Sequence, residues 1–371
     1  MSLYKDLNTS EGMDKITDVT KVTAGYFSDA GGKKTSANLH SGSLATSNEK
    51  YYYNIALDSE TGTTQFSVTY GHVGGSGSVT DSNNVKGETQ AIYEQWANVL
   101  LPENEVTGGF KISANSGLAS APSAAATSTR DNNIYVLVLK RSLFKDRLNK
   151  KNWTLQLSGH LTNGTTSKAL QLTDDSNTSA GVGTPAGRRY NIVSGSQGTV
   201  AKTAATKTYG WVYPELGVLV FSGAELSASL PGKAATAAAV TYQSASQMGF
   251  ATNDATNAAQ NDALRFVNCL TTQSLAGFTP YLQARSEEDQ TSVSYFCRAR
   301  AGEFNFSNSP TFVSGSVNEV RHLDMHGNPV VFITGVNLFS ADGTMIAQGK
   351  LSTPLKKNFS SEATIKVKLT Y

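Results

Sequence analysis

The nine residues ATIKVKLTY, Ala363–Tyr371, decide the fold class of this chain. Thr or Lys occupies every even position, and the odd positions are all apolar: Ala363, Ile365, Val367, Leu369 and Tyr371. Successive side chains of a strand point to opposite faces, so a period of two is typical of a half-buried antiparallel strand. The stretch therefore predicts a strand that ties this part of the chain to a sheet.

A hairpin is predicted immediately before this strand, in VVFITGVNLFSADGTMIAQGKL. Two apolar runs, Val330–Phe339 and Thr344–Leu351, flank the turn Ser340–Gly343. Asp-Gly in the turn supplies the positive φ that a tight hairpin connection needs. Short strands of the same kind are predicted upstream: Tyr51–Leu57, Gln65–Tyr70, Ile134–Leu139, Trp153–Leu157, Lys168–Leu172, Arg189–Val193, Tyr209–Tyr213, Val218–Phe221, Phe278–Ala284 and Ser292–Ala299.

Two helices interrupt this pattern. Glu88–Leu101 ends before Pro102 and has an apolar stripe, which we expect to comprise Ala91, Ile92, Gln95, Trp96, Val99 and Leu100. Asn261–Gln273 is the second helix, with Leu264, Phe266, Val267 and Leu270 as its apolar residues. The sequence thus predicts a mainly β fold, with multi-domain antiparallel β-sandwich-like units and two or three short helices.

Composition shifts divide the chain into five predicted segments. They are a polar N-terminal arm (1–50), an N-terminal β/α domain (51–110), a middle β domain (130–225), an Ala/Thr-rich connector with a helix (226–275) and a C-terminal β domain (276–371). Loops are predicted at 71–85, 108–133, 181–187 and 194–208, and a hairpin turn at Asn163-Gly164.

The charge pattern argues against two classes of partner. Charged residues are 16% of the chain and the net charge is +2, whereas an average soluble protein has about 25% charged residues. Basic residues cluster only in pairs such as Lys150-Lys151, so we expect no nucleic-acid binding. No apolar run approaches the roughly 20 residues that span a bilayer, so we expect no membrane insertion. Cys269 and Cys297 lack a CxxC context and are predicted to be free buried thiols.

Two Gly-rich segments partly match phosphate-binding loops. Gly71–Ser78 follows a strand but lacks the Gly-Lys-Ser/Thr ending, and Gly31–Thr35 has Lys34 where a hydroxyl is needed. We therefore interpret both as connectors and predict no cofactor.

The remaining ionisable groups are weak candidates for chemistry. His322 and His326 have a spacing that suits metal ligands on a helix, with Asp324 between them, but a Gly-Asn-Pro turn follows at once. The triplet Glu287–Asp289 could serve a glycosidase-like depolymerase, although a solvated turn explains it better. The sequence therefore predicts no catalytic residue and no metal site, and thus no enzyme.

A resemblance to a known family rests on a series of blocks along the chain. Arg300–Phe312 (RAGEFNFSNSPTF), Ile333–Phe339 (ITGVNLF) and Ala347–Lys356 resemble virion structural proteins of contractile-tailed bacteriophages, most of all baseplate-wedge-type proteins. Further matching blocks lie at 51–57, 66–78, 89–101, 134–148, 152–153, 189–196 and 213–218. None of these blocks is a catalytic signature, so the likeness depends on their combination and order.

The resemblance implies a non-enzymatic structural subunit, a baseplate wedge component assembled in the host bacterial cytoplasm and located in the virion tail. Its partners would be other tail or baseplate subunits and copies of itself, recognised through aromatic anchors and strand edges. The interface candidates are Phe304, Phe306, Phe312, Trp211, Tyr213 and Tyr371, for each of which core packing is the alternative. The alternative function is a host-glycan-binding adhesin or tail-fibre-associated module, which exposed Trp or Tyr platforms would favour.

Overall fold

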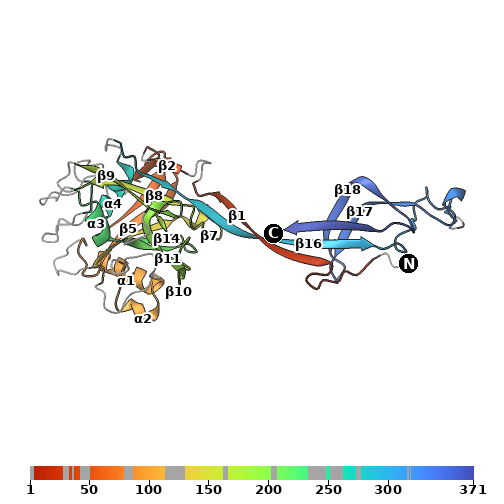
Figure 1. Ribbon diagram of the computed structural model, residues 1–371, viewed down its shortest axis with the longest axis horizontal. Coiled ribbons are helices and arrows are strands. Elements are labelled where there is room, and N and C mark those ends of the chain that lie inside the picture. The colour runs from red at the N-terminus through yellow and green to blue at the C-terminus, as the bar shows by residue number, and fades with distance from the viewer. Residues whose placement is uncertain are drawn as a thin grey trace. The chain divides into compact units, whose positions relative to one another are not determined.

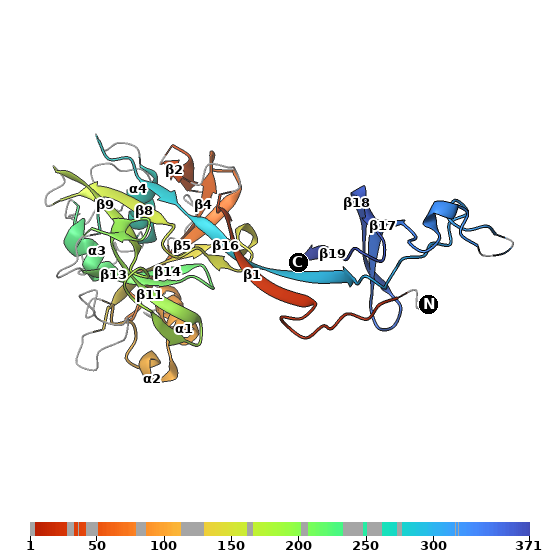
Figure 2. The same cartoon turned by 45° about the vertical axis from the view of Figure 1, so that its right-hand side comes forward.

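The structure, a computed structural model, describes residues 4–27, 33–35, 37–41, 51–78, 87–112, 130–161, 166–201, 207–232, 248–250, 262–272, 277–315, 317 and 319–371. The chain forms two compact units, which we call unit 1 (Met1–Lys21 and Asp289–Tyr371) and unit 2 (Val22–Glu288). Two strands, β1 (Lys15–Gly25) and β16 (Arg285–Ala299), contribute residues to both units. Figures 1 and 2 show the elements of each unit.

Unit 2 is built on one large antiparallel sheet. Its strands, in the order of their pairing, are β2 (Lys33–Thr35), β15 (Tyr281–Gln283), β8 (Thr154–His160), β9 (Ser167–Asp174), β11 (Gly187–Ser196), β13 (Thr208–Tyr213), β14 (Val218–Ser222), β6 (Asn133–Leu139), β5 (Thr64–His72), β4 (Tyr52–Leu57) and β3 (Leu39–Ser41). Two short strands, β10 (Val182–Thr184) and β12 (Thr199–Val200), pair with β11, and β7 (Arg147–Leu148) pairs with β16.

The two ends of this sheet come close together. β2 and β3 are consecutive in the chain, and the Asn38 N–H donates to the Thr35 carbonyl at 2.9 Å. Helix α4 (Asp262–Thr271) contacts β8 near one end of the sheet and β3, β4 and β5 at the other. The sheet therefore curls around α4 and is nearly closed.

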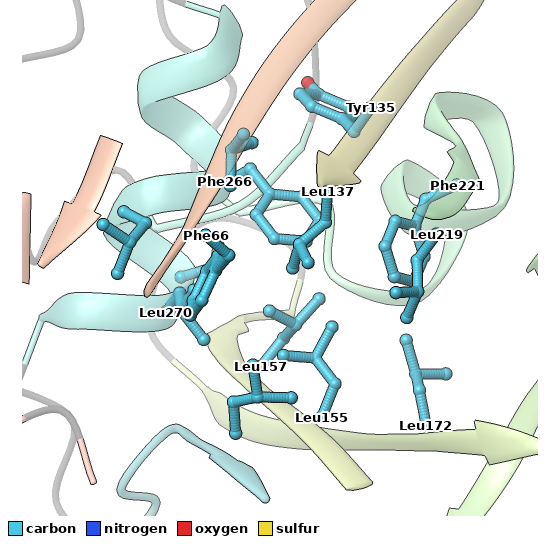
Figure 3. Close-up of a cluster of buried hydrophobic side chains, with 14 of the residues drawn as sticks. Phe66, Tyr135, Leu137, Leu155, Leu157, Leu172, Leu219, Phe221, Phe266 and Leu270 are labelled. Carbon is cyan, nitrogen blue, oxygen red and sulfur yellow. The ribbon is translucent and has the colours of Figure 1, made fainter. Parts of the chain in front are cut away.

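The interior of unit 2 is an apolar core between this sheet and α4. Figure 3 shows Phe266 and Leu270 of α4 among inward-facing side chains from five strands: Phe66, Tyr135, Leu137, Leu155, Leu157, Leu172, Leu219 and Phe221. Phe266 also lies within 6 Å of the ring centroids of Tyr135, Phe221 and Phe250. The aromatic residues give this core a large buried apolar area, which is the dominant favourable term in folding.

A second apolar layer covers the outer face of the same sheet. β6 places Tyr135 and Leu137 inside, whereas Ile134 and Val136 point outward against helix α1 (Glu88–Leu100). Helix α2 (Glu103–Val106) follows α1, and helix α3 (Gly223–Ser229) follows β14 with Ser222 accepting the Glu225 N–H at its start. Both faces of β6 are buried, which explains its continuous apolar run.

Unit 1 is assembled from strands around the C-terminal part of β16. β16 lies between β1 and β19 (Ala363–Thr370) in one sheet, and β17 (Val331–Phe339) pairs with β18 (Met345–Lys357) in a separate two-stranded sheet. A 3₁₀ turn, Leu323–Met325, lies between these parts. The predicted C-terminal strand and hairpin are confirmed, and Gly343 has the positive φ of 86° expected of its turn.

The mainly β prediction is confirmed, but several details differ. The described residues contain four α-helices, since α2 and α3 were not predicted. α1 buries Thr89, Tyr93, Ala97 and Leu100, so Leu100 is the one residue of the expected stripe that is fully buried. Tyr93 turns inward, whereas Val99 is 47% exposed. β10 and β12 lie in segments predicted as loops.

The predicted division into five segments also differs from the two observed units. The N-terminal arm contains β1, β2 and β3, and its Tyr26, Phe27 and Leu39 are buried in the core of unit 2. The helix of the predicted connector is likewise internal to unit 2. Asn163-Gly164, Gly31-Gly32, the whole of 113–129 and all of 233–261 except 248–250 lie outside the described residues.

Candidate interaction surface

Unit 1 buries little apolar material. Its buried hydrophobic residues are Val293, Ala299, Phe312, Val313, Val331, Leu338 and Ala363. The only cluster that they form among the described residues of the unit consists of Phe312, Val313 and Val331, with Val320 and Met325 packed against it. A two-stranded sheet such as β17–β18 is at best marginally stable in water unless something covers one face.

Large apolar side chains are instead exposed on unit 1. Among the described residues, fifteen of the nineteen exposed large hydrophobic side chains belong to it: Tyr4, Met13, Ile16, Val19, Phe304, Phe306, Val317, Leu323, Phe332, Phe339, Met345, Ile346, Leu355, Phe359 and Tyr371. At the tip of the hairpin, Tyr4 packs edge-on against Phe339 with ring centroids 5.4 Å apart, and Phe339 pairs with Met345 across the strands. Large exposed apolar patches are typical of interaction sites, so unit 1 is the candidate interaction surface.

The segment Arg300–Phe306 presents two of these aromatic residues on a fixed backbone. The buried Lys357 ammonium donates to Ala301 O at 3.0 Å, Asn305 Oδ1 at 2.7 Å and Asn358 O at 2.8 Å. Burial lowers the pKa of Lys357 against the opposing effect of two carboxylates. All three ammonium protons thus have acceptors, which is how a buried cation can be accommodated.

Phe304 has a strained backbone in this segment. Its φ is +53°, which is uncommon for a bulky residue, and its side chain is 38% exposed. Its neighbour Glu303 forms an ion pair with Lys5 at 2.5 Å and accepts the Arg300 N–H at 2.9 Å. Strain of this kind persists only where the surroundings impose it and is often found at functional sites.

The six interface candidates predicted from sequence are placed differently from one another. Phe304 and Phe306 are exposed, and Phe306 contacts the buried Phe312 edge-on at 5.6 Å. Tyr371 is 77% exposed, although its backbone pairs with Thr291. These three are available to a partner, whereas Phe312 serves the small core of unit 1.

Trp211 and Tyr213 are not surface residues, so their selection as contacts was wrong. Both are fully buried in unit 2 beneath α1 and α2, because β13 is covered on both faces. Arg189 stacks over the Trp211 ring at 4.1 Å and forms a bidentate ion pair with Glu105 at 2.8 and 3.1 Å. This arrangement ties α2 to the sheet. Trp153 is also buried, so two of the three tryptophans are not available as glycan-stacking platforms.

The Gly-rich segment after β5 forms a compact turn. The N–H groups of Gly74 and Ser76 donate to His72 Nδ1 at 2.9 and 3.3 Å. Ser78 Oγ accepts the Thr89 N–H at 3.0 Å at the start of α1. The polar groups of this segment thus organise the passage from β5 to α1.

The acidic triplet does not form the predicted turn, since Arg285–Ala299 is one continuous strand. Glu287 forms an ion pair with Arg147 at 2.8 Å, and Glu288 pairs with Lys145 at 2.7 Å. Neighbouring residues of a strand point to opposite faces, so these two carboxylates do not converge on one substrate.

The other predicted groups are placed as follows. His326 Nε2 lies 3.3 Å from Val320 O, and within the described ranges no group of three or more His, Cys, Asp or Glu residues could hold a metal ion.

Cys269 is buried as predicted, and burial raises the pKa of its thiol to about 12. Cys297 is only partly buried. No helix in the described parts of the chain has the length and apolar character of a membrane span.

Most of the exposed apolar residues of the hairpin were not among the interface residues predicted from the sequence. Phe332, Met345 and Ile346 lie in predicted strands, but their side chains are exposed. A signal was present, because Met345 and Ile346 are adjacent and must therefore place apolar side chains on both faces of β18.

Comparisons with protein-family models, with curated proteins and with solved structures find no match to this chain.

Proposed function

We propose that this chain is a non-enzymatic structural subunit of a contractile phage tail, a component of the baseplate wedge, and that unit 1 supplies its main contact surface. The observation that carries the assembly role is the concentration of exposed apolar side chains on unit 1 beside a small core. Burying one large apolar side chain contributes about 1.5–3 kcal/mol, so covering several of them gives a strong drive to associate. The tail assignment is supported by the sequence blocks at 300–312, 333–339 and 347–356.

The proposal is tested by incorporation into particles. A phage that encodes this chain would carry Phe332→Asp or Ile346→Asp, at side chains 59% and 58% exposed in unit 1, and Val99→Asp would be the matched control in unit 2. Since all three side chains are exposed, each purified variant should unfold at the temperature of the unchanged chain. We expect tail particles to lack the unit 1 variants and to retain Val99→Asp. Normal incorporation of both unit 1 variants, or absence of the unchanged chain from tails, contradicts the proposal.

A further inference from the structure

Strand β19 is an edge of the unit 1 sheet, and its hydrogen-bond register shows which groups face outward. Thr291 and Tyr371 exchange both backbone hydrogen bonds, at 3.0 and 3.1 Å, and the register from Ser292↔Thr370 to Ala299↔Ala363 runs without a shift. In an antiparallel ladder, hydrogen-bonded pairs alternate with non-hydrogen-bonded pairs. The peptide groups of the odd residues of β19 therefore face β16.

The even residues of β19, Thr364, Lys366, Lys368 and Thr370, direct their N–H and C=O groups away from β16. The far side of β16 agrees with this alternation, because its even residue Phe296 donates its N–H to Asp14 O at 2.9 Å. Within the described residues, β19 ends the order of strands in this sheet. It thus offers an unbulged edge of eight residues.

The other edge strand of this sheet, β1, forms hydrogen bonds with the residues that precede it in the chain. The Gly12 N–H donates to Lys15 O at 2.9 Å. The Glu11 carboxylate accepts the Thr17 N–H at 2.5 Å and the Thr17 hydroxyl at 3.0 Å. Proteins commonly protect edge strands in such ways, and an edge that is left open is a template for another strand.

The side chains along β19 indicate what kind of strand fits. Ile365, Val367 and Leu369 are half-buried on one face, and the exposed Lys366 and Lys368 lie on the other, where Lys366 sits 5.7 Å from the Phe296 ring centroid. Opposite charges across a strand pair stabilise it and like charges destabilise it. Two copies of β19 pairing about a two-fold axis would place these lysines against each other, so the charges disfavour a second copy.

We propose that the outer edge of β19 binds an extended strand of a neighbouring subunit that has carboxylates on one face and apolar side chains on the other. This inference rests on the proposed assembly role. Main-chain hydrogen bonds from Thr364–Thr370 hold the added strand, and Lys366 and Lys368 select its charge.

The test uses the purified full-length chain and needs no phage particle. The probe is a fluorescently labelled eight-residue peptide with blocked termini, in which Val alternates with Asp or Glu. Its binding is followed by fluorescence anisotropy. We expect binding that weakens as salt is added. A peptide with Lys in place of the acids should not bind. The acidic peptide with N-methyl groups along one edge should also fail to bind, although the protein is unchanged, because it cannot form the ladder.

Variants of the chain separate main-chain pairing from charge. Lys366→Ala should weaken binding, whereas Lys366→Pro should abolish it, because proline also removes an outward N–H. Reversing both charges, K366E with K368E, should transfer binding to the basic peptide.

Three results overturn the inference. They are no binding of the acidic peptide, equal binding of its N-methylated form, or a self-association of the unchanged chain that is lost in Lys366→Pro. A chain that binds the peptide as expected but is absent from tails would refute the proposed function and leave the edge assignment standing.

Discussion

Asp175 is an ionisable residue in the core that follows strand β9 directly. Its carboxylate accepts the Asn191 N–H at 3.1 Å and the Asn191 side-chain amide at 2.9 Å, and it is fully buried. Burial raises the pKa of this carboxyl from 3.8 to about 6, against the opposing hydrogen bonds from Asn191. Asp174 beside it accepts the Lys151 and Ser176 N–H groups and adds a like charge.

The raised pKa of Asp175 predicts a pH dependence of stability. The folded state binds a proton more tightly than the unfolded state, so this group's contribution is fully present below pH 4 and is lost as the pH rises through about 6. The full difference amounts to at most about 3 kcal/mol. Urea unfolding at pH 4.5 and pH 7.5 should show a smaller difference for Asp175→Asn than for the unchanged chain. An identical difference in both proteins would contradict the shift.

Lys357 predicts a local effect in unit 1. Lys357→Met keeps the length of the side chain but removes the ammonium that donates to the buried Asn305 Oδ1 and to the carbonyls of Ala301 and Asn358. The Ala301 carbonyl keeps the Asn305 amide as a donor, so Asn305 Oδ1 is the group most affected. An unsatisfied buried polar group costs about 1–3 kcal/mol. We expect faster amide exchange over Arg300–Phe306 in this variant. Lys356→Met, at the exposed neighbour, is the control and should leave exchange in this segment unchanged.

At the scale of elements, strands with a clear period were predictable from sequence. β19 and the β17–β18 hairpin lie within one or two residues of their predicted starts, because alternation and an Asp-Gly turn are local signals. The first part of β16 was predicted as a solvated turn between the strands Phe278–Ala284 and Ser292–Ala299, because three adjacent carboxylates suggest solvent. Instead, Arg147 and Lys145 on the neighbouring segment neutralise two of them, and such a partner is remote in sequence.

The candidate surface was only partly predictable, for the same reason. Phe304, Phe306 and Tyr371 were identified, but Trp211 was taken as a contact although it is fully buried. An aromatic residue in a strand has the same local pattern whether a helix or solvent covers that face. What covers β13 is decided by α1 and α2, which come from a segment about a hundred residues earlier in the chain.

β19 predicts the effect of a truncation. Every residue of Ala363–Thr370 is paired with β16. Without this strand, Val293 and Tyr295 of β16 would lose their cross-strand neighbours Leu369 and Val367. Deletion of Ala363–Tyr371 should therefore give insoluble chain or tail particles that lack this subunit. Deletion of Tyr371 alone removes one exposed side chain and one backbone pair, and should be tolerated. Normal solubility and assembly of the longer truncation would show that the strand is dispensable.

At the scale of the whole molecule, the two units differ in how they meet the cost of ordering the chain. Unit 2 buries an inner core around α4 and an outer layer under α1. Among its described residues, unit 1 has only the small Phe312 cluster and many exposed apolar side chains. Fixing the backbone costs about 1–2 kcal/mol per residue, so unit 1 has much less burial to offset that cost by itself.

This difference predicts how hydrogen exchange is distributed along the isolated chain. Amides of β6, β13 and β14 should exchange most slowly, because they open only with the core of unit 2. Amides of β17 and β18 should exchange much faster, since each strand has one partner and little cover. In assembled tail particles, exchange in β17 and β18 should slow while that in β6 stays the same. Equal protection of β17 and β6 in the isolated chain would show that unit 1 is stable by itself, and its exposed apolar side chains would then need an explanation other than assembly.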